Sequence, residues 1–143
     1  MASNVQSRRL SDLSGVRRGA LVAYRWLLLA FLLAGGAQIF LAGLGVFSFG
    51  NGDRAGGDHA FSAHQGLGFA IAGASVLLAL AIAARAGRLA VWLAVALVVQ
   101  TNLLQSLLDS LGGDSAVFGG LHALDGLLIA ASAGVQYVLV RRR

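Results

Sequence analysis

Two histidines, His64 and His122, each lie a few residues inside one end of a long apolar segment. These segments are the second and fourth of four, and few other polar residues interrupt the apolar runs. A haem iron held by two histidines takes its axial imidazoles from opposite sides, so the ligands come from helices that face each other across a core. The pair therefore predicts a bound b-type haem (haem b) with His64 and His122 as its ligands, serving electron transfer or haem handling.

Residues at a similar depth have the types that such a pocket needs. Gly68 and Gly126 each follow a histidine by four residues on the same helix face, where glycine allows a neighbouring helix or a flat ligand to approach. The second ring nitrogen of a ligating histidine needs an acceptor, and Gln38, Gln105 and Asp109 are the candidates. The chain has no cysteine, which excludes a thiolate metal site and a covalently attached c-type haem.

A second interpretation treats the same polar residues as joints between helices. All of them are expected in the outer half of the membrane, and intramembrane polar side chains usually face the bundle interior. Asp125 would then pair with His122, while Asn102, Gln105 and Asp109, spaced i, i+3 and i+7 on one face, would form hydrogen bonds between spans. On this interpretation the histidines hold no cofactor.

A third interpretation is a non-haem metal site. His59, His64, His122 and an aspartate would supply imidazole and carboxylate ligands suited to zinc or copper. His59 is however expected in a loop, because two helical residues five positions apart lie on nearly opposite faces. Ser62 and Ser106 lie near the histidines in depth, but nothing builds an oxyanion site beside them, so the sequence gives little support to nucleophilic catalysis.

Four apolar segments must position these residues, and each is long enough to cross a bilayer as a helix. They are residues 21–47, 61–84, 89–111 and 117–140. About 20 apolar residues span the hydrocarbon core, where only helices and closed barrels satisfy their own backbone. The chain is 57% hydrophobic and 12% charged, against about 25% charge in soluble domains. The prediction is an all-α fold, a four-helix transmembrane up-down bundle in the lipid bilayer.

The links between these segments differ in composition. Residues 48–60 contain four glycines, an asparagine and two aspartates, and are predicted to form a flexible outer loop. The second link and the third link, around residues 112–115, are short, which makes sequential helices antiparallel neighbours. In an up-down bundle the second and fourth helices, which carry the two histidines, then lie diagonally across the core.

The distribution of arginine predicts the orientation in the membrane. All eleven basic residues are arginine; ten lie in the first 25 residues, in the second link or at the C-terminus, and only Arg54 lies in the first link. By the positive-inside rule, the basic tail of residues 1–20 and the basic end of residues 141–143 are cytoplasmic. The absence of lysine and the high alanine, glycine and leucine content are typical of a GC-rich bacterium. The expected location is the bacterial cytoplasmic membrane, and the net charge of +5 is attributed to topology, with no nucleic-acid partner.

The chain resembles one four-helix half of the haem A synthase family over about residues 20–140, and the resemblance is carried by residues 64–66, 104–108 and 120–124. In that family, histidines on the second and fourth helices of each half ligate haem, so the resemblance implies this role for His64 and His122. The family has a glutamate three residues before the first histidine and an arginine after it, where this chain has Phe61 and Gln65. The resemblance therefore implies haem binding rather than haem A synthesis.

A different class of function stays open beside haem binding. The chain is also similar to small four-span proteins of GC-rich bacteria. A non-catalytic membrane subunit or assembly factor would use a face of small residues, such as the one from Gly35 to Gly45 in the first segment, to bind other membrane subunits or a second copy of itself. Such a protein would need no cofactor.

Overall fold

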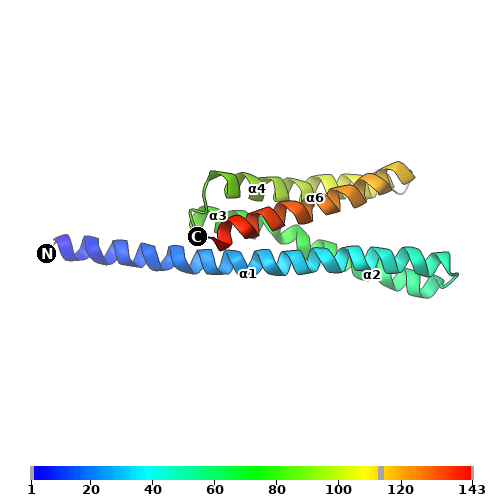
Figure 1. The fold of residues 1–143 in the computed structure, drawn as a ribbon, viewed down its shortest axis with the longest axis horizontal. Coiled ribbons are helices and arrows are strands. Elements are labelled where there is room, and N and C mark those ends of the chain that lie inside the picture. The colour runs from blue at the N-terminus through cyan, green and yellow to red at the C-terminus, as the bar shows by residue number, and fades with distance from the viewer. Residues whose placement is uncertain (1, 113–114, 143) are drawn as a thin grey trace.

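The protein is helical almost throughout in the computed structural model, which describes residues 2–112 and 115–142 (Figure 1). No strand occurs in these two ranges. The helical elements in chain order are α1 (Ala2–Gly50), α2 (Arg54–Ile71), the 3₁₀ turn η1 (Ala72–Ala74), α3 (Ser75–Ala83), α4 (Arg88–Val99), the π-helical turn η2 (Gln100–Leu104), α5 (Gln105–Gly112) and α6 (Ala116–Arg141).

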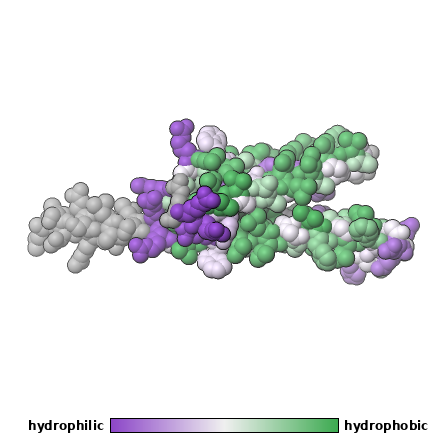
Figure 2. Space-filling model, viewed as in Figure 1, coloured by the Kyte–Doolittle hydropathy of each residue, from purple (hydrophilic) through white to green (hydrophobic). Residues whose placement is uncertain are grey.

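Four helical stretches are long and apolar enough to cross a membrane. They are Gly15–Gly50, Arg54–Ala83, Arg88–Gly112 and Ala116–Arg141. Hydrophobic side chains cover most of the bundle surface, and hydrophilic side chains gather at its two ends (Figure 2). The prediction of an all-α chain with four helices able to span a membrane is therefore confirmed, while the side of the membrane that each terminus faces stays a prediction.

The predicted flexible loop over residues 48–60 is wrong. Helix α1 continues to Gly50 and α2 begins at Arg54, so only residues 51–53 separate the two helices. The chain reverses at Gly52, whose φ of 83° lies in the left-handed region that glycine adopts readily. Asp53 then caps α2, because its side chain accepts a hydrogen bond from the Gly56 N–H at 2.9 Å.

Two glycines let α1 and α2 pack closely: Gly57, from the predicted loop, and Gly45, from the small-residue face of the first span. A Cβ atom on Gly45 would lie 2.6 Å from the Phe61 ring, and one on Gly57 would lie 2.8 Å from the Phe49 ring. The two phenylalanine rings also stack on each other, with centroids 5.8 Å apart. Tertiary packing thus explains glycine inside these helix ends, where intrinsic propensity alone disfavours it.

The predicted basic tail of residues 1–20 is, from Ala2 onward, part of the same helix as the first span. Its N-terminal part projects beyond the other helices (Figure 1). At 1.5 Å per residue, the 49 residues of α1 extend over roughly 70 Å, more than twice the thickness of a hydrocarbon core.

The packed core lies toward the end of the bundle that carries Arg17, Arg25, Arg85 and Arg88, called the arginine-rich end below. Its buried residues are mostly small or medium in size, which allows the helices to approach closely; they include Tyr24, Leu28, Ala81, Ala90, Ala94, Leu97, Ala133 and Val140. Two arginines of α1 cap neighbouring helices there. Arg17 Nε donates to the Ala84 carbonyl and Arg25 Nε to the Val140 carbonyl, both at 3.2 Å.

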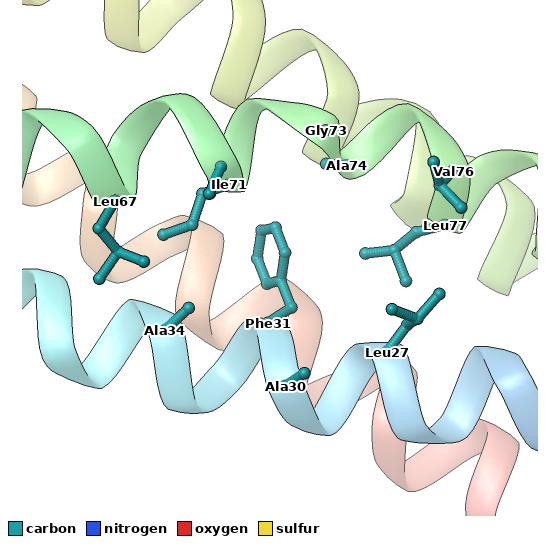
Figure 3. A pocket seen from close by; sticks show the side chains of 11 residues that line it. Leu27, Ala30, Phe31, Ala34, Leu67, Ile71, Gly73, Ala74, Val76 and Leu77 are labelled. Atoms are coloured by element: carbon teal, nitrogen blue, oxygen red, sulfur yellow. The ribbon is translucent and has the colours of Figure 1, made fainter.

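An apolar pocket of about 200 Å³ lies between α1 and the break in the second span at η1. The Phe31 ring rises from α1 between Ile71 and Leu77 (Figure 3). Every lining residue is apolar or glycine. The pocket therefore offers no polar group for chemistry, and the candidate site lies elsewhere.

At the opposite end the helices form two hairpins, α1 with α2 and α5 with α6. Helix α2 makes no extensive backbone contact with α5 or α6. The two hairpins diverge (Figure 1), and the space-filling view shows an open cleft between them (Figure 2). Both predicted haem ligands lie on helices that border this cleft, which is called the outer cleft below.

Candidate functional site

The structure brings His64 of α2 and His122 of α6 together across the outer cleft. Their ring centroids are 6.2 Å apart and their ring planes meet at 58°. Two imidazoles that bind one metal ion from opposite sides, with metal–nitrogen bonds of about 2.0 Å, place their centroids roughly 6 Å apart. Because each ring plane needs only to contain its own metal–nitrogen bond, an angle of 58° between the planes is compatible with joint ligation.

The orientation of His64 is set by a backbone carbonyl. Its Nδ1 lies 3.0 Å from the Gln38 carbonyl oxygen. A carbonyl can only accept, so Nδ1 carries the proton and Nε2 keeps its lone pair for a ligand. An Nδ1–H bond to a backbone carbonyl is a common way of orienting a metal-ligating histidine. Gln38 thus supplies the predicted acceptor through its main chain and not through its side chain.

His122 has a different environment. Its Nδ1 is buried and has no hydrogen-bond partner in the described part of the chain. Leaving a buried polar atom unpaired is unfavourable by about 1–3 kcal/mol, so this nitrogen is available for a ligand or a proton acceptor. Gln105, the predicted acceptor, contacts the His122 main chain instead, where its Nε2 donates to the carbonyl at 3.0 Å.

The two glycines predicted to flank a flat ligand differ. A Cβ on Gly68 would lie 3.1 Å from Gln38 Nε2, so Gly68 makes room for the glutamine side chain of α1. The other amide atom, Gln38 Oε1, is buried and has no hydrogen-bond partner among the described residues. A Cβ on Gly126 would meet no atom within 4 Å, which leaves this face of α6 open.

Asp125 lies one helical turn beyond His122 and is only 4% exposed. Its two carboxylate oxygens accept hydrogen bonds from Gln100 Nε2 at 3.2 Å and from Gln105 Nε2 at 2.9 Å. Asp125 therefore does not make the pair with His122 that the helix-joining interpretation expected, although it does join α6 to η2 and α5. A carboxylate inside a span is unfavourable unless such donors satisfy it.

Gln100 was not recognised from the sequence, and the reason is the π-helical turn η2. Residues five apart in an α-helix are rotated by about 140°, which places Gln100 and Gln105 on different faces. In the structure the Gln105 N–H bonds to the Gln100 carbonyl, an i+5 bond, and both amides reach Asp125. Short π-helical turns occur frequently at functional sites. The sequence feature that could have identified Gln100 is the presence of two glutamines, five residues apart, in an otherwise apolar span.

The same turn alters the polar face predicted on the third span. Asn102 and Asp109 are exposed, and only Gln105 of the three points toward another helix. The Asn102 amide donates to the Val98 carbonyl of its own helix at 3.0 Å. Asp109 is therefore not an acceptor for either imidazole.

A further pair of buried polar residues lies away from the histidines. The Tyr24 hydroxyl donates to Gln136 Oε1 near the arginine-rich end, and both side chains are fully buried. Gln136 Nε2 has no partner in the described residues. This pair joins α1 to α6 on the far side of the core from the histidines.

His59 takes no part in the cleft. It lies in the first turns of α2, not in a loop, and its side chain is exposed. Among the side chains that the structure describes, those of residues 15–74, 76–112 and 115–142, no three histidine, cysteine or acidic groups come together as a metal-binding group. The non-haem metal interpretation therefore has no ligand set there, whereas a haem needs only the two histidines.

No known protein family, curated protein or solved structure matches the chain. The likeness to one half of the haem A synthase family thus rests on the residues quoted above, and stays a prediction.

Proposed function

We propose that this protein binds one b-type haem in the outer cleft, with His64 and His122 as the axial ligands. The observation that carries the proposal is that the imidazole rings of His64 and His122, from two different hairpins, lie with their centroids 6.2 Å apart. Further support comes from His64, whose Nδ1 is engaged by the Gln38 carbonyl so that Nε2 is available, and from His122, whose buried Nδ1 has no partner in the part of the chain that the structure describes.

A bound haem would supply one-electron chemistry or be cargo for transfer. The chain's own residues would hold it. The Gln38 carbonyl fixes the tautomer and the plane of the His64 ring. Phe61 packs edge-on against His64, with centroids 6.5 Å apart, and restricts the ring on the side of the α1–α2 turn. The gap between the diverging hairpins in Figure 2 is where the flat ligand would enter.

The proposal includes an orientation. Sequential spans run up and down through a bacterial cytoplasmic membrane, both termini face the cytoplasm, and the haem lies near the outer surface. Support comes from the arginines, since Arg17, Arg25 and Arg88 belong to the end of the bundle opposite the outer cleft.

A visible spectrum tests the proposal. The protein is purified in mild detergent with haem supplied, and its reduced-minus-oxidised difference spectrum is recorded. Wild-type protein should show the bands of a low-spin haem, and His64→Ala and His122→Ala should each abolish them, because each removes one axial ligand. His59→Ala is the matched control and should leave the spectrum unchanged, since His59 is exposed on the same helix as His64. A wild-type protein without haem bands would overturn the proposal.

The alternative function is a membrane subunit or assembly factor without a cofactor. One observation favours it: Cβ atoms on Gly35, Gly36 and Gly43 would meet nothing within 4 Å, so one stretch of small residues on α1 is not covered by the rest of the chain. In that case neither the wild-type protein nor the histidine variants would show haem bands in the difference spectrum. The histidine variants would still co-purify with the partner protein whose helices bind α1.

A further inference from the structure

A shallow pocket of about 420 Å³ opens at the arginine-rich end, where the chain turns from α3 to α4. Ile82 of α3 and Val91 and Trp92 of α4 form its apolar wall. Arg85 and Arg88 form its basic rim, and both are exposed. The pocket is thus lined by two arginines together with apolar side chains.

The apolar wall faces outward. Ile82 is 59% exposed and Trp92 is 65% exposed, although both belong to spans that bury apolar side chains elsewhere. Tryptophan concentrates at the level of lipid headgroups, where its ring meets the acyl chains and its N–H meets polar groups. The pocket therefore lies at the depth where a lipid headgroup joins its chains.

The backbone at Arg85 points to a role for its side chain. Arg85 has a φ of 48°, in the left-handed region. The Arg85 N–H bonds to the Ile82 carbonyl at 3.0 Å and the Ala86 N–H to the Ala81 carbonyl at 2.9 Å, which is the helix-ending arrangement usually completed by glycine. Glycine would therefore fit this backbone better than arginine does, so the arginine at this position is explained by its side chain and not by its backbone.

No carboxylate is available along this part of the chain to neutralise the two arginines. There is no aspartate or glutamate between His59 and Leu108. The first turn of α4 adds backbone donors, because its N-cap residue is Gly87 and no side chain caps the helix. Charge complementarity thus favours an anion at the rim, and the wall beneath favours an anion with a hydrocarbon chain.

We propose that this pocket binds an anionic phospholipid. Arg85 and Arg88 hold the headgroup phosphate through charge-assisted hydrogen bonds, and an acyl chain lies along Ile82, Val91 and Trp92. Basic pockets between membrane helices hold anionic lipid headgroups through the same combination of charge and apolar contact. The proposal does not depend on haem binding.

The test titrates phosphatidylglycerol onto the full-length detergent-solubilised protein and measures bound lipid by native mass spectrometry. Wild-type protein should bind it saturably. Arg85→Gly should weaken binding about fivefold, and Arg85→Gly combined with Arg88→Ala about 25-fold, since each basic residue near a membrane surface contributes a factor of this size. Because glycine suits the backbone at residue 85, Arg85→Gly should unfold no more easily than the wild type, as circular dichroism will show.

Arg18→Ala combined with Arg142→Ala is the matched control. It removes two exposed arginines from outside the pocket, and binding should change less than twofold. A loss equal to that of the pocket variant would overturn the proposal in favour of general charge attraction. Equal binding of phosphatidylcholine would overturn the requirement for an anionic lipid. Displacement of the lipid by millimolar inorganic phosphate would show a free-phosphate site and would also overturn it.

Discussion

The three histidines have three different surroundings, and these determine which of them can bind a ligand. His59 is exposed on α2, His64 is oriented by the Gln38 carbonyl, and His122 has a buried ring nitrogen that no described residue pairs with. The sequence set His59 apart from the other two because it lies five residues before His64, which puts the two side chains on nearly opposite faces of a helix. Its predicted place in a loop is wrong, since it lies in α2. The sequence did not identify the Gln38 carbonyl, because every residue has a main-chain oxygen and only the packing of α1 on α2 selects one.

Gln105 provides a test of the polar cluster at the residue scale. Its amide donates both to the buried Asp125 carboxylate and to the His122 carbonyl. Gln105→Ala should lower the free energy of unfolding by about 1–2 kcal/mol, because it leaves a buried acceptor unsatisfied. Asn102→Ala, on the same span but bonded only within its own helix, should lower it by less than about 0.5 kcal/mol. Circular dichroism during unfolding in mixed micelles measures both, and equal losses would show that the buried cluster is not responsible.

At the scale of elements, the length of the apolar segments predicted the spanning helices. The spacing of residues along each segment did not predict where a helix departs from regular α-helical geometry. Each span was found because about 20 apolar residues have one stable form in lipid. The π-helical turn η2 departs from the 3.6-residue period for a tertiary reason, the burial of Asp125 between two amides. The glycines of residues 48–60 misled for a similar reason, since Gly57 lies inside a helix beneath Phe49.

Deleting one residue from η2 tests whether the extra residue of the turn is needed to keep both amides on Asp125. Without Leu103, Gln100 and Gln105 are four residues apart, and a regular α-helix places such residues about 40° apart on one face, so both amides can still reach the carboxylate. The deletion should therefore lower the free energy of unfolding by less than about 1 kcal/mol. Gln100→Ala removes one donor from the buried carboxylate and should lower it by about 1–3 kcal/mol. If the deletion loses as much stability as Gln100→Ala, a regular helix does not keep both amides on Asp125 and the π-helical turn is required.

At the scale of the whole molecule, the two ends of the bundle differ in packing. The arginine-rich end holds the buried core and the carbonyl caps from Arg17 and Arg25, while the other end opens into a cleft between two hairpins. The four spans and the meeting of two histidines were predictable from length, spacing and depth. The divergence of the hairpins was not, because it depends on how four apolar surfaces pack, and apolar surfaces of similar composition have many nearly equivalent packings.

The orientation of the bundle can be tested with single cysteines, because the chain contains none of its own. Asn51 lies exposed in the α1–α2 turn and Arg142 lies exposed just after α6. If arginine retention on the cytoplasmic side sets the topology, a membrane-impermeant maleimide should label Asn51→Cys in intact bacterial spheroplasts and should label Arg142→Cys only after lysis. The opposite result, labelling of Arg142→Cys in sealed spheroplasts with Asn51→Cys protected, would mean that the orientation is reversed. The cleft would then open on the cytoplasmic side. A haem between His64 and His122 would exchange electrons with cytoplasmic partners instead of extracytoplasmic ones.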